Sequence, residues 1–381
     1  MKELKRIQNP YNEAKVIDAC SVFGMMDQSG KCFSGEGVIR AIANMHDRGN
    51  GLGGGFAIYG LYPDLADYFA FHIMYLSVQA KKQTEDYLNK KFAIIQCEEV
   101  PTQPTTTIND PPLVWRYFTS CNKPPVKEFI EEEYVISCVM EINTGIDGAF
   151  VFSSGKDMAV FKGVGYPEEI AEFFNLKQYM GYLWTAHGRF PTNTPGWWGG
   201  AHPFCLLDWT VVHNGELSSY GINRRYLEQF GYKCTMQTDT EVVAYAIDLL
   251  IRKHKLPIEI AAKILAPPLW SEIERHPKRE RELLKALRQV YGSLLLNGPF
   301  TVIIAHHGEM IGLTDRIRLR PLTVGTKNDV LYLSSEESAI RLICPNLDSA
   351  WIPMGGEPII GRLTERQPSS PTAEGVGSSA N

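Results

Sequence analysis

Hydrophobic and polar positions along the chain predict strands and helices that come in separate groups. Short runs of apolar, β-branched and aromatic residues, bounded by Gly, Pro, Asn or Asp, are typical of strands. Such runs are CSVFGMM (20–26), FAFHIMYLSVQA (69–80), KFAIIQC (91–97), YVISCVMEI (134–142), GAFVFSS (148–154), MAVFKG (158–163), MGYLWTAHG (180–188), WTVVHNG (209–215), FTVIIAHHG (300–308), MIGLTD (310–315) and VLYLSSE (330–336).

Amphipathic helices are predicted between these groups of strands. Residues 35–46 place Val38, Ile39, Ile42 and Met45 three and four positions apart, which is the spacing of one helix face. The same spacing recurs in DTEVVAYAIDLLIRK (239–253) and PKRERELLKALRQVYGSLLL (277–296). Because strands and helices do not alternate singly, the pattern favours a layered α+β fold over a doubly wound parallel sheet.

Composition divides the chain into one long globular region and two short ends. Residues 99–127 are rich in proline and are predicted to form an irregular surface insertion. The segment 364–381 has almost no large apolar residues and is predicted to be disordered. Nothing between 21 and 362 has the composition of a linker, so we expect one domain (20–363), a leader (1–19) and a tail (364–381).

Charge and cysteine content narrow the classes of function. The 381 residues are 44% hydrophobic and 21% charged, with a formal net charge of -5, so we expect neither nucleic acid nor a membrane as partner. No apolar run reaches the length of a membrane span, and residues 1–19 lack the apolar core of a secretory signal. The eight cysteines show no C-x-x-C spacing, which argues against zinc and iron–sulfur sites. We therefore expect reduced thiols and a cytoplasmic location.

Cys20 lies at the start of the first predicted strand and allows two interpretations. It is either a buried core thiol or the first residue of a processed enzyme, with the freed α-amino group as its base. Taken alone, the pattern favours the core, because free cysteine is among the most buried residue types.

The segment 187–241 holds most of the other candidate residues, each of which has an alternative structural role. Arg189 is either a surface cation or a planar, bidentate partner for a substrate carboxylate. Asn214-Gly215 is either a tight turn or an oxyanion hole built from a side-chain amide and a backbone N–H.

Asp239 likewise has two interpretations. Thr238 and Glu241 have the spacing of a capping box, which would make Asp239 the first residue of a helix, where a carboxylate favours the helix dipole. Alternatively, Asp239 holds a substrate ammonium group.

The glycine-rich segment NGLGGGFAIYG (50–60) fits neither a dinucleotide-binding fingerprint nor a P-loop. It predicts a turn or a close approach between backbones rather than a phosphate site.

Taken together and in order, these residues resemble the class II glutamine amidotransferases, which are N-terminal-nucleophile hydrolases. The likeness is greatest to the amidotransferase domain of glutamate synthase. It rests on CSVFGM (20–25), MHDRGN (45–50), HGRFPTNT (187–194), HNGEL (213–217), TDTEVVAY (238–245), GPFTVIIA (298–305), LTDRIRLRPLTVG (313–325) and LSSEESA (333–339).

The resemblance implies a four-layer αββα sandwich and a role for each candidate residue. Cys20 would be the nucleophile and, once residues 1–19 are removed, would supply its own amine as base. The oxyanion donors would be Asn214 and Gly215. The substrate-binding residues would be Arg189, Thr192, Asn193 and Asp239. No cofactor is implied. The sequence departs from the family pattern at Ser21, where glycine is usual.

The same resemblance implies a glutaminase that converts free L-glutamine to glutamate and ammonia. No second region that would use the ammonia is recognised, so we expect a separate synthase subunit as partner, in a glutamate synthase-like complex. Two alternatives remain: a non-catalytic glutamine-binding or regulatory subunit, and a hydrolase of another amide.

Overall fold

The computed structural model describes residues 19–122, 129–191 and 195–364. Most of its strands belong to two antiparallel sheets. In spatial order, the first sheet contains β17 (Ser349–Trp351), β15 (Thr323–Lys327), β16 (Val330–Ser334), β1 (Ser21–Asp27), β10 (Leu183–Gly188), β3 (Gly54–Tyr59) and β8 (Met158–Gly163). The second sheet contains β11 (Phe204–Leu206), β12 (Trp209–Gly215), β13 (Phe300–His306), β14 (Glu309–Thr314) and β18 (Ile359–Arg362).

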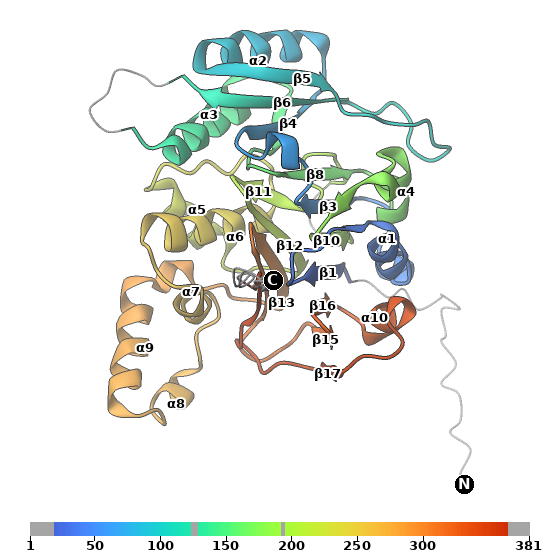
Figure 1. The fold of residues 1–381 in the computed structure, drawn as a ribbon. Helices are drawn as coiled ribbons and strands as arrows, with labels where there is room; N and C mark the ends of the chain where they lie inside the picture. Colours follow the sequence, from blue (N-terminus) through green and yellow to red (C-terminus); the bar gives the residue numbers. More distant parts are fainter. Residues whose placement is uncertain (1–18, 123–128, 192–194, 365–381) are drawn as a thin grey trace, which may run out of the picture.

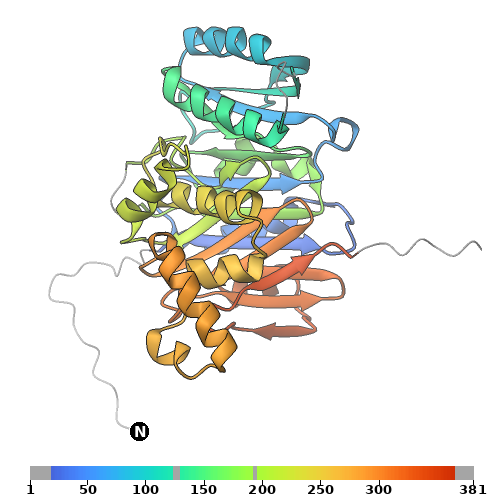
Figure 2. The ribbon, with the colours of Figure 1, turned by 90° about the vertical axis from the view of Figure 1, so that its left-hand side faces the viewer.

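The two sheets pack face to face between two layers of helices (Figures 1 and 2). Successive side chains of a strand point to opposite faces, and β1 illustrates the result. Val22 and Met26 pack with Val212 and Ile303 of the second sheet, whereas Phe23 belongs to the core beneath the helices of the first sheet. The α+β class and the αββα sandwich expected from the sequence are confirmed.

Helices of different regions cover the outer faces of the two sheets. The first sheet is covered by α1 (Glu36–Ala43), α4 (Pro167–Phe173) and α10 (Glu337–Ile343). The second sheet is covered by α5 (Tyr220–Glu228), α6 (Asp239–Ile247) and α7 (Ile258–Leu265), with α8 (Trp270–Ile273) and α9 (Lys278–Val290) beyond them. A π-helical turn (Asp248–Lys253) continues α6.

A third sheet extends the molecule at the top of Figure 1. It consists of β5 (Phe92–Glu99), β6 (Leu113–Cys121), β4 (Phe69–Tyr75) and β7 (Ala149–Ser153), with α2 (Val78–Lys91) and α3 (Glu131–Gly145) against one face. A short pair, β2 (Phe33–Ser34) and β9 (Met180–Gly181), and single turns of 3-10 helix complete the elements.

Two predictions made for this third region were wrong. The run 134–142 was expected to be a strand but lies inside α3. Glu131, Glu132 and Glu133 fill the first turn, where carboxylates favour the helix dipole. Val135, Val139 and Ile142 recur at helical spacing and are buried, so packing on the third sheet outweighs the strand preference of β-branched residues.

The second error concerns the proline-rich segment 99–127, which was expected to be irregular throughout. Its residues 113–121 form β6, which pairs with β4 on one side and β5 on the other. The prolines that precede it, Pro111 and Pro112, stop just short of the strand, so they remove no ladder hydrogen bond.

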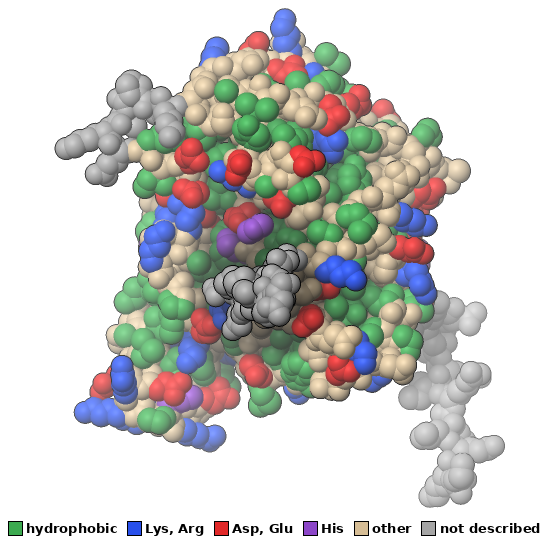
Figure 3. Space-filling view, in the orientation of Figure 1, with side chains coloured by type: hydrophobic (Ala, Val, Ile, Leu, Met, Phe, Trp, Pro, Cys, Tyr) green, Lys and Arg blue, Asp and Glu red, His purple; other side chains and the backbone are tan. Residues whose placement is uncertain are grey.

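The predictions for the ends of the chain fall almost entirely outside the described residues. Residues 1–18 and 365–381, which carry the proposed leader and tail, are among those that the structure does not describe. Within the described part of the chain, every helix is too short or too polar to cross a lipid bilayer. The face in Figure 3 carries acidic and basic side chains interspersed with one another.

The hydroxyl group of Tyr59 joins the two central sheets. Tyr59 lies on β3 of the first sheet and is fully buried. Its hydroxyl group lies 2.7 Å from the Asp208 carbonyl oxygen, 2.7 Å from Thr210 Oγ1 and 2.9 Å from the Ala305 carbonyl oxygen. These three oxygens belong to the second sheet or the turn that leads into it. The Tyr59 O–H donates toward the carbonyl oxygens and its oxygen can accept from the Thr210 hydroxyl, so the group makes buried hydrogen bonds across the two sheets.

Removing this hydroxyl group should destabilise the fold. Tyr59→Phe leaves buried oxygens without their partner, and we expect a loss of about 1–3 kcal/mol in the free energy of unfolding, measured by urea denaturation. Tyr226→Phe is the control, because the Tyr226 hydroxyl makes no hydrogen bond to the described residues. Equal stability of the two variants would contradict a role of Tyr59 in holding the sheets together.

Candidate active site

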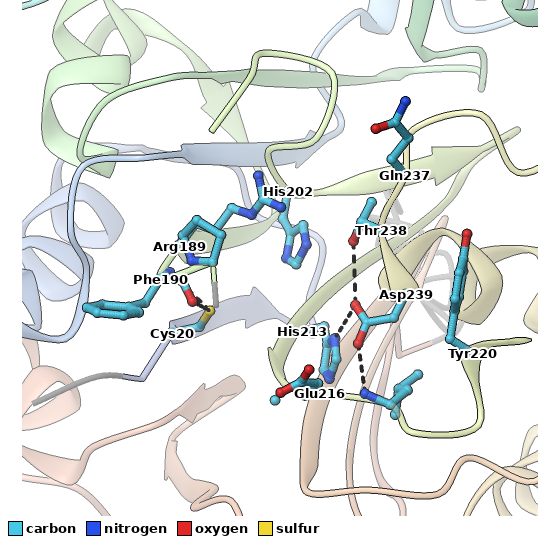
Figure 4. A pocket seen from close by; sticks show the side chains of 13 residues that line it. Cys20, Arg189, Phe190, His202, His213, Glu216, Tyr220, Gln237, Thr238 and Asp239 are labelled. Atoms are coloured by element: carbon cyan, nitrogen blue, oxygen red, sulfur yellow. Dashed lines mark hydrogen bonds and ion pairs between the residues drawn. The ribbon is translucent and has the colours of Figure 1, made fainter. Parts of the chain in front are cut away.

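A cavity of about 190 Å³ lies where β1, β10, β12 and α6 meet (Figure 4). Its lining includes four of the residues predicted from the sequence: Cys20, Arg189, Gly215 and Asp239. Cys20 and Arg189 lie on one side and Asp239 on the other. The remaining lining residues are Phe190, Pro191, His202, His213, Glu216, Leu217, Tyr220, Gln237 and Thr238.

Cys20 directly precedes β1 and is held at both its side chain and its backbone. The Phe190 N–H donates to Cys20 Sγ over 3.2 Å, and Arg48 Nε donates to the Cys20 carbonyl oxygen over 3.2 Å. Burial raises the pKa of the Cys20 thiol, although the Phe190 N–H and the Arg189 charge act in the opposite direction. The thiol therefore needs a nearby base to become the reactive thiolate at neutral pH.

Ser21, the departure from the family pattern, fits because of the residue opposite it. Ser21 pairs with Gly188 across β1 and β10, and it is buried. A Cβ atom at position 188 would come within 2.5 Å of Ser21 Oγ. The glycine on β10 therefore leaves the space that the serine side chain on β1 occupies.

Arg189 follows β10 and is almost fully buried. Its backbone N–H donates to the Gly53 carbonyl oxygen over 2.8 Å, and its Nη1 donates to the Pro195 carbonyl oxygen over 3.5 Å. Burial lowers the pKa of Arg189, while Cys20 and Asp239 act in the opposite direction. Arginine stays protonated under such conditions, so the cavity contains a permanent cation close to the thiol.

Asn214 and Gly215 end β12. Asn214 is fully buried, and neither atom of its amide has a hydrogen-bond partner among the described residues. Asn214 is two residues from Val212, and Cys20 is two residues from Val22; both valines lie in the layer between the sheets. Strand alternation therefore directs Asn214 and Cys20 into the same layer, although Asn214 is not among the residues that line the cavity.

Gly215 is required by the backbone at this point. Its φ of 149° lies in a region that favours glycine. A Cβ atom here would also come within 2.0 Å of the Pro299 carbonyl oxygen. The chain can therefore turn out of β12 and present backbone to the cavity only with glycine at this position.

Asp239 is the first residue of α6, as the sequence predicts. Its Oδ2 accepts a hydrogen bond from the Leu217 N–H over 2.8 Å, and its Oδ1 lies 3.7 Å from His213 Nδ1. Burial alone would raise the pKa of Asp239, but His213, the Leu217 N–H and the Thr240 hydroxyl lower it overall. The cavity thus contains a carboxylate that is ionised at neutral pH, opposite the guanidinium of Arg189.

The capping box expected around Asp239 forms only in part. Thr238 is the N-cap, and its hydroxyl accepts from the Thr240 N–H. The Glu241 carboxylate does not accept a hydrogen bond from the Thr238 backbone N–H. It accepts instead from the N–H groups of Thr235 and Met236. The glutamate therefore fixes the preceding loop, because those two donors would otherwise be unpaired in the interior.

Three buried histidines that the sequence analysis did not assign lie around the cavity. His187 Nε2 lies 2.8 Å from the His213 carbonyl oxygen and 3.0 Å from His202 Nδ1. Burial lowers the pKa of His187 to about 3 and that of His202 well below its usual value, so both rings are neutral. The sequence indicated the importance of two of these histidines only through their neighbours: His187 lies two positions before Arg189, and His213 directly precedes Asn214.

The two remaining predicted binding residues, Thr192 and Asn193, lie outside the described residues. Across the ranges that the structure does describe, no group of three His, Cys, Asp or Glu side chains is arranged to hold a metal ion.

Comparison with known proteins relates this site to one family. The family model described as "Glutamine amidotransferases class-II" matches residues 69–347, a span that contains Arg189, Asn214, Gly215 and Asp239 and begins after Cys20. An uncharacterized protein of Archaeoglobus fulgidus is 59% identical over 353 residues, which is 92% of this chain and 93% of that protein.

Two more distant relatives are larger proteins. The glutamate synthase [NADPH] large chain of Bacillus subtilis is 28% identical over 225 residues, which covers 53% of this chain and 14% of that protein. The structure of glutamine phosphoribosylpyrophosphate amidotransferase from B. subtilis aligns with a TM-score of 0.46 and 16% identity, covering 90% of this chain and 47% of that chain. Because the family model spans well over half of its residues, this chain belongs to the class II glutamine amidotransferases.

Proposed function

We propose that this chain is a glutaminase that converts free L-glutamine and water to glutamate and ammonia through a thioester on Cys20. The observation that carries the proposal is the convergence of Cys20, Arg189, Gly215 and Asp239 on one cavity. These residues come from distant parts of the chain. Together they offer a nucleophile, a cation, a backbone donor and an anion within a space suited to a small molecule.

The chemistry begins with the removal of the residues before Cys20. Cleavage of the Ala19–Cys20 bond frees an α-amino group, whose usual pKa of about 7.7–8.0 suits proton transfer near neutral pH. This amine accepts the proton of Cys20 Sγ, which burial otherwise retains on the sulfur. The resulting thiolate attacks the side-chain amide carbon of glutamine.

The attack forms a tetrahedral intermediate with a negative oxygen. The Asn214 amide, which lacks a partner among the described residues, and the Gly215 backbone N–H donate to this oxygen. The C–N bond then breaks, and the ammonium group of Cys20 returns its proton to the leaving nitrogen, releasing ammonia. Water, with the amine again as base, hydrolyses the γ-glutamyl thioester and restores the thiol.

Arg189 and Asp239 select a free amino acid. The Arg189 guanidinium binds the α-carboxylate through two parallel hydrogen bonds, and the Asp239 carboxylate binds the α-ammonium. A glutamine residue within a peptide lacks both charges, and a simple amide lacks at least one. The same two residues disfavour a hydrolase of an amide that lacks the α-carboxylate and α-ammonium groups of a free amino acid.

The ammonia acceptor is a separate synthase subunit, in a complex like glutamate synthase. Ammonia is mostly protonated at neutral pH and is then a poor nucleophile, so direct transfer to a second site preserves its reactivity. Co-purification of this chain from its native source, followed by a test for glutamine-dependent synthesis, examines this step. A chain that purifies alone and supports no such synthesis would contradict the proposed partner.

The first test of the glutaminase is intact mass and N-terminal sequencing before and after treatment with 6-diazo-5-oxo-L-norleucine, a glutamine-analogue electrophile. We expect a chain that begins at Cys20 and carries one adduct there. Cys20→Ala should carry no adduct and hydrolyse no glutamine, whereas Cys32→Ala, which removes an exposed cysteine, should behave as the wild type. A folded chain that keeps its leader and binds glutamine without hydrolysing it would favour the non-catalytic glutamine-binding subunit.

Replacing Arg189 by lysine should weaken glutamine binding more than turnover. A lysine ammonium keeps the charge but cannot present two parallel N–H groups to a carboxylate. We expect KM for glutamine to rise at least roughly tenfold with a smaller change in kcat, measured by a coupled assay for glutamate. An unchanged KM would exclude Arg189 as the carboxylate ligand.

Asn214→Ala should lower turnover rather than binding. Loss of one oxyanion donor reduces kcat by roughly 10²–10³, while KM changes little because the donor acts on the intermediate. Asn223→Ala is a useful control for loss of a buried amide, since Asn223 binds the Ser293 and Leu295 carbonyl oxygens away from the cavity. Similar kcat values in both variants would remove Asn214 from the oxyanion hole.

A further inference from the structure

Lys162 is a buried lysine outside the residues assigned to catalysis. It lies on β8 with 1% of its surface exposed. Its Nζ donates to the Gly199 carbonyl oxygen over 3.0 Å and lies over the rings of Phe204 and Phe152, at 4.4 and 4.9 Å from their centres. Among the ion pairs of the described residues, none involves Lys162.

A buried ammonium without a carboxylate partner is unfavourable for folding. Burial lowers the pKa of Lys162 to about 7; the nearby Arg189 also lowers it, whereas Cys205 and Glu241 raise it. An apolar side chain of similar length would fill the same space without this penalty. The position therefore calls for an explanation other than packing.

The contact of Lys162 holds one particular segment, residues 195–202, on the first sheet. Glycines on β3 and β8 let this segment approach their backbones closely. A Cβ atom at Gly55 would lie 2.3 Å from the His202 carbonyl oxygen, and one at Gly163 would lie 2.6 Å from the Trp198 ring. The close backbone approach predicted from the glycine-rich sequence 50–60 is thus confirmed, with this segment as the neighbour.

The same segment contacts Arg189 from its other side. The Pro195 carbonyl oxygen accepts from Arg189 Nη1, and a Cβ atom at Gly200 would lie 3.2 Å from that nitrogen. At its end, His202 lines the cavity. A shift of the turn that contains Gly199 would therefore move groups packed against the guanidinium.

We infer that Lys162 is a positioning residue for substrate binding: its hydrogen bond to Gly199 fixes the segment 195–202, and through it the Arg189 guanidinium. Lys162 does not line the cavity, so it acts on the substrate only through the segment 195–202 and the groups packed against it, of which Arg189 is the one proposed to bind the substrate. The inference rests on the proposed function, because it presumes that Arg189 binds the carboxylate of glutamine.

The test replaces Lys162 by methionine, which keeps the length of the side chain but cannot donate to Gly199. The matched control is Lys327→Met, which removes an exposed lysine, paired with Asp348, from β15 of the same sheet. We expect Lys162→Met to raise KM for glutamine roughly tenfold with a change in kcat of less than about threefold. Lys327→Met should keep both constants. A general disturbance of the fold would instead lower kcat or the yield of folded protein.

A second measurement does not depend on turnover. Isothermal titration calorimetry with L-glutamine, in the Cys20→Ala background, gives the Kd directly. We expect the Kd to rise roughly tenfold in Lys162→Met and to stay unchanged in Lys327→Met. If Lys162→Met does not fold, Lys162→Gln takes its place. Glutamine keeps an N–H donor without the charge, so we expect its Kd to rise above the wild-type value by less than roughly tenfold.

The outcomes separate this inference from the proposed function. A chain with intact Cys20 that hydrolyses glutamine, together with equal KM and Kd values in Lys162→Met and Lys327→Met, overturns the role of Lys162 alone. Absence of glutamine hydrolysis in the processed wild type overturns the proposed function, and absence of glutamine binding overturns both.

Discussion

The candidate site depends on one buried hydrogen bond between the two central sheets. His187 Nε2 donates to the His213 carbonyl oxygen over 2.8 Å. His187 stands two residues before Arg189 on the first sheet, and His213 directly precedes Asn214 on the second. The bond therefore fixes the end of β10, which Arg189 follows, relative to the end of β12, where the proposed oxyanion donors Asn214 and Gly215 lie. Because burial keeps the His187 ring neutral, the bond introduces no charge between the sheets.

Opposite charges at two sides of a small cavity follow from this register. Arg189 reaches the cavity from the first sheet, whereas Asp239 reaches it from α6, behind the second sheet. Each charge is stabilised by its own neighbours: Arg189 is packed against the segment 195–202, and Asp239 accepts from the Leu217 N–H. Arg189 and Asp239 therefore place opposite charges at two sides of the cavity, which is the arrangement that the proposed binding of an amino acid requires.

The errors of the sequence-based predictions have a common physical cause. In α3 and β6, local residue preferences competed with packing on the third sheet, and the packing decided the outcome. Glu241 shows the same effect on a smaller scale. Its spacing from Thr238 predicts a capping box, but its carboxylate accepts instead from two N–H groups of the folded loop, those of Thr235 and Met236. Local spacing cannot anticipate donors that only the folded chain brings near.

The sequence by itself determined most strands, the amphipathic helices, and the chemical types and order of the motifs that indicated the family. It offered Cys20, Arg189, Gly215 and Asp239 as candidates, each with an alternative structural role, and the resemblance of the ordered motifs to the family assigned their functional roles. Only the tertiary structure decided that these residues share a cavity, that Gly188 makes room for Ser21, and that Lys162 contacts the Gly199 carbonyl oxygen and His187 the His213 carbonyl oxygen. The reason is geometric: strand alternation fixes the face on which a side chain lies, but the atoms opposite it belong to another sheet, whose position depends on the packing of the whole chain.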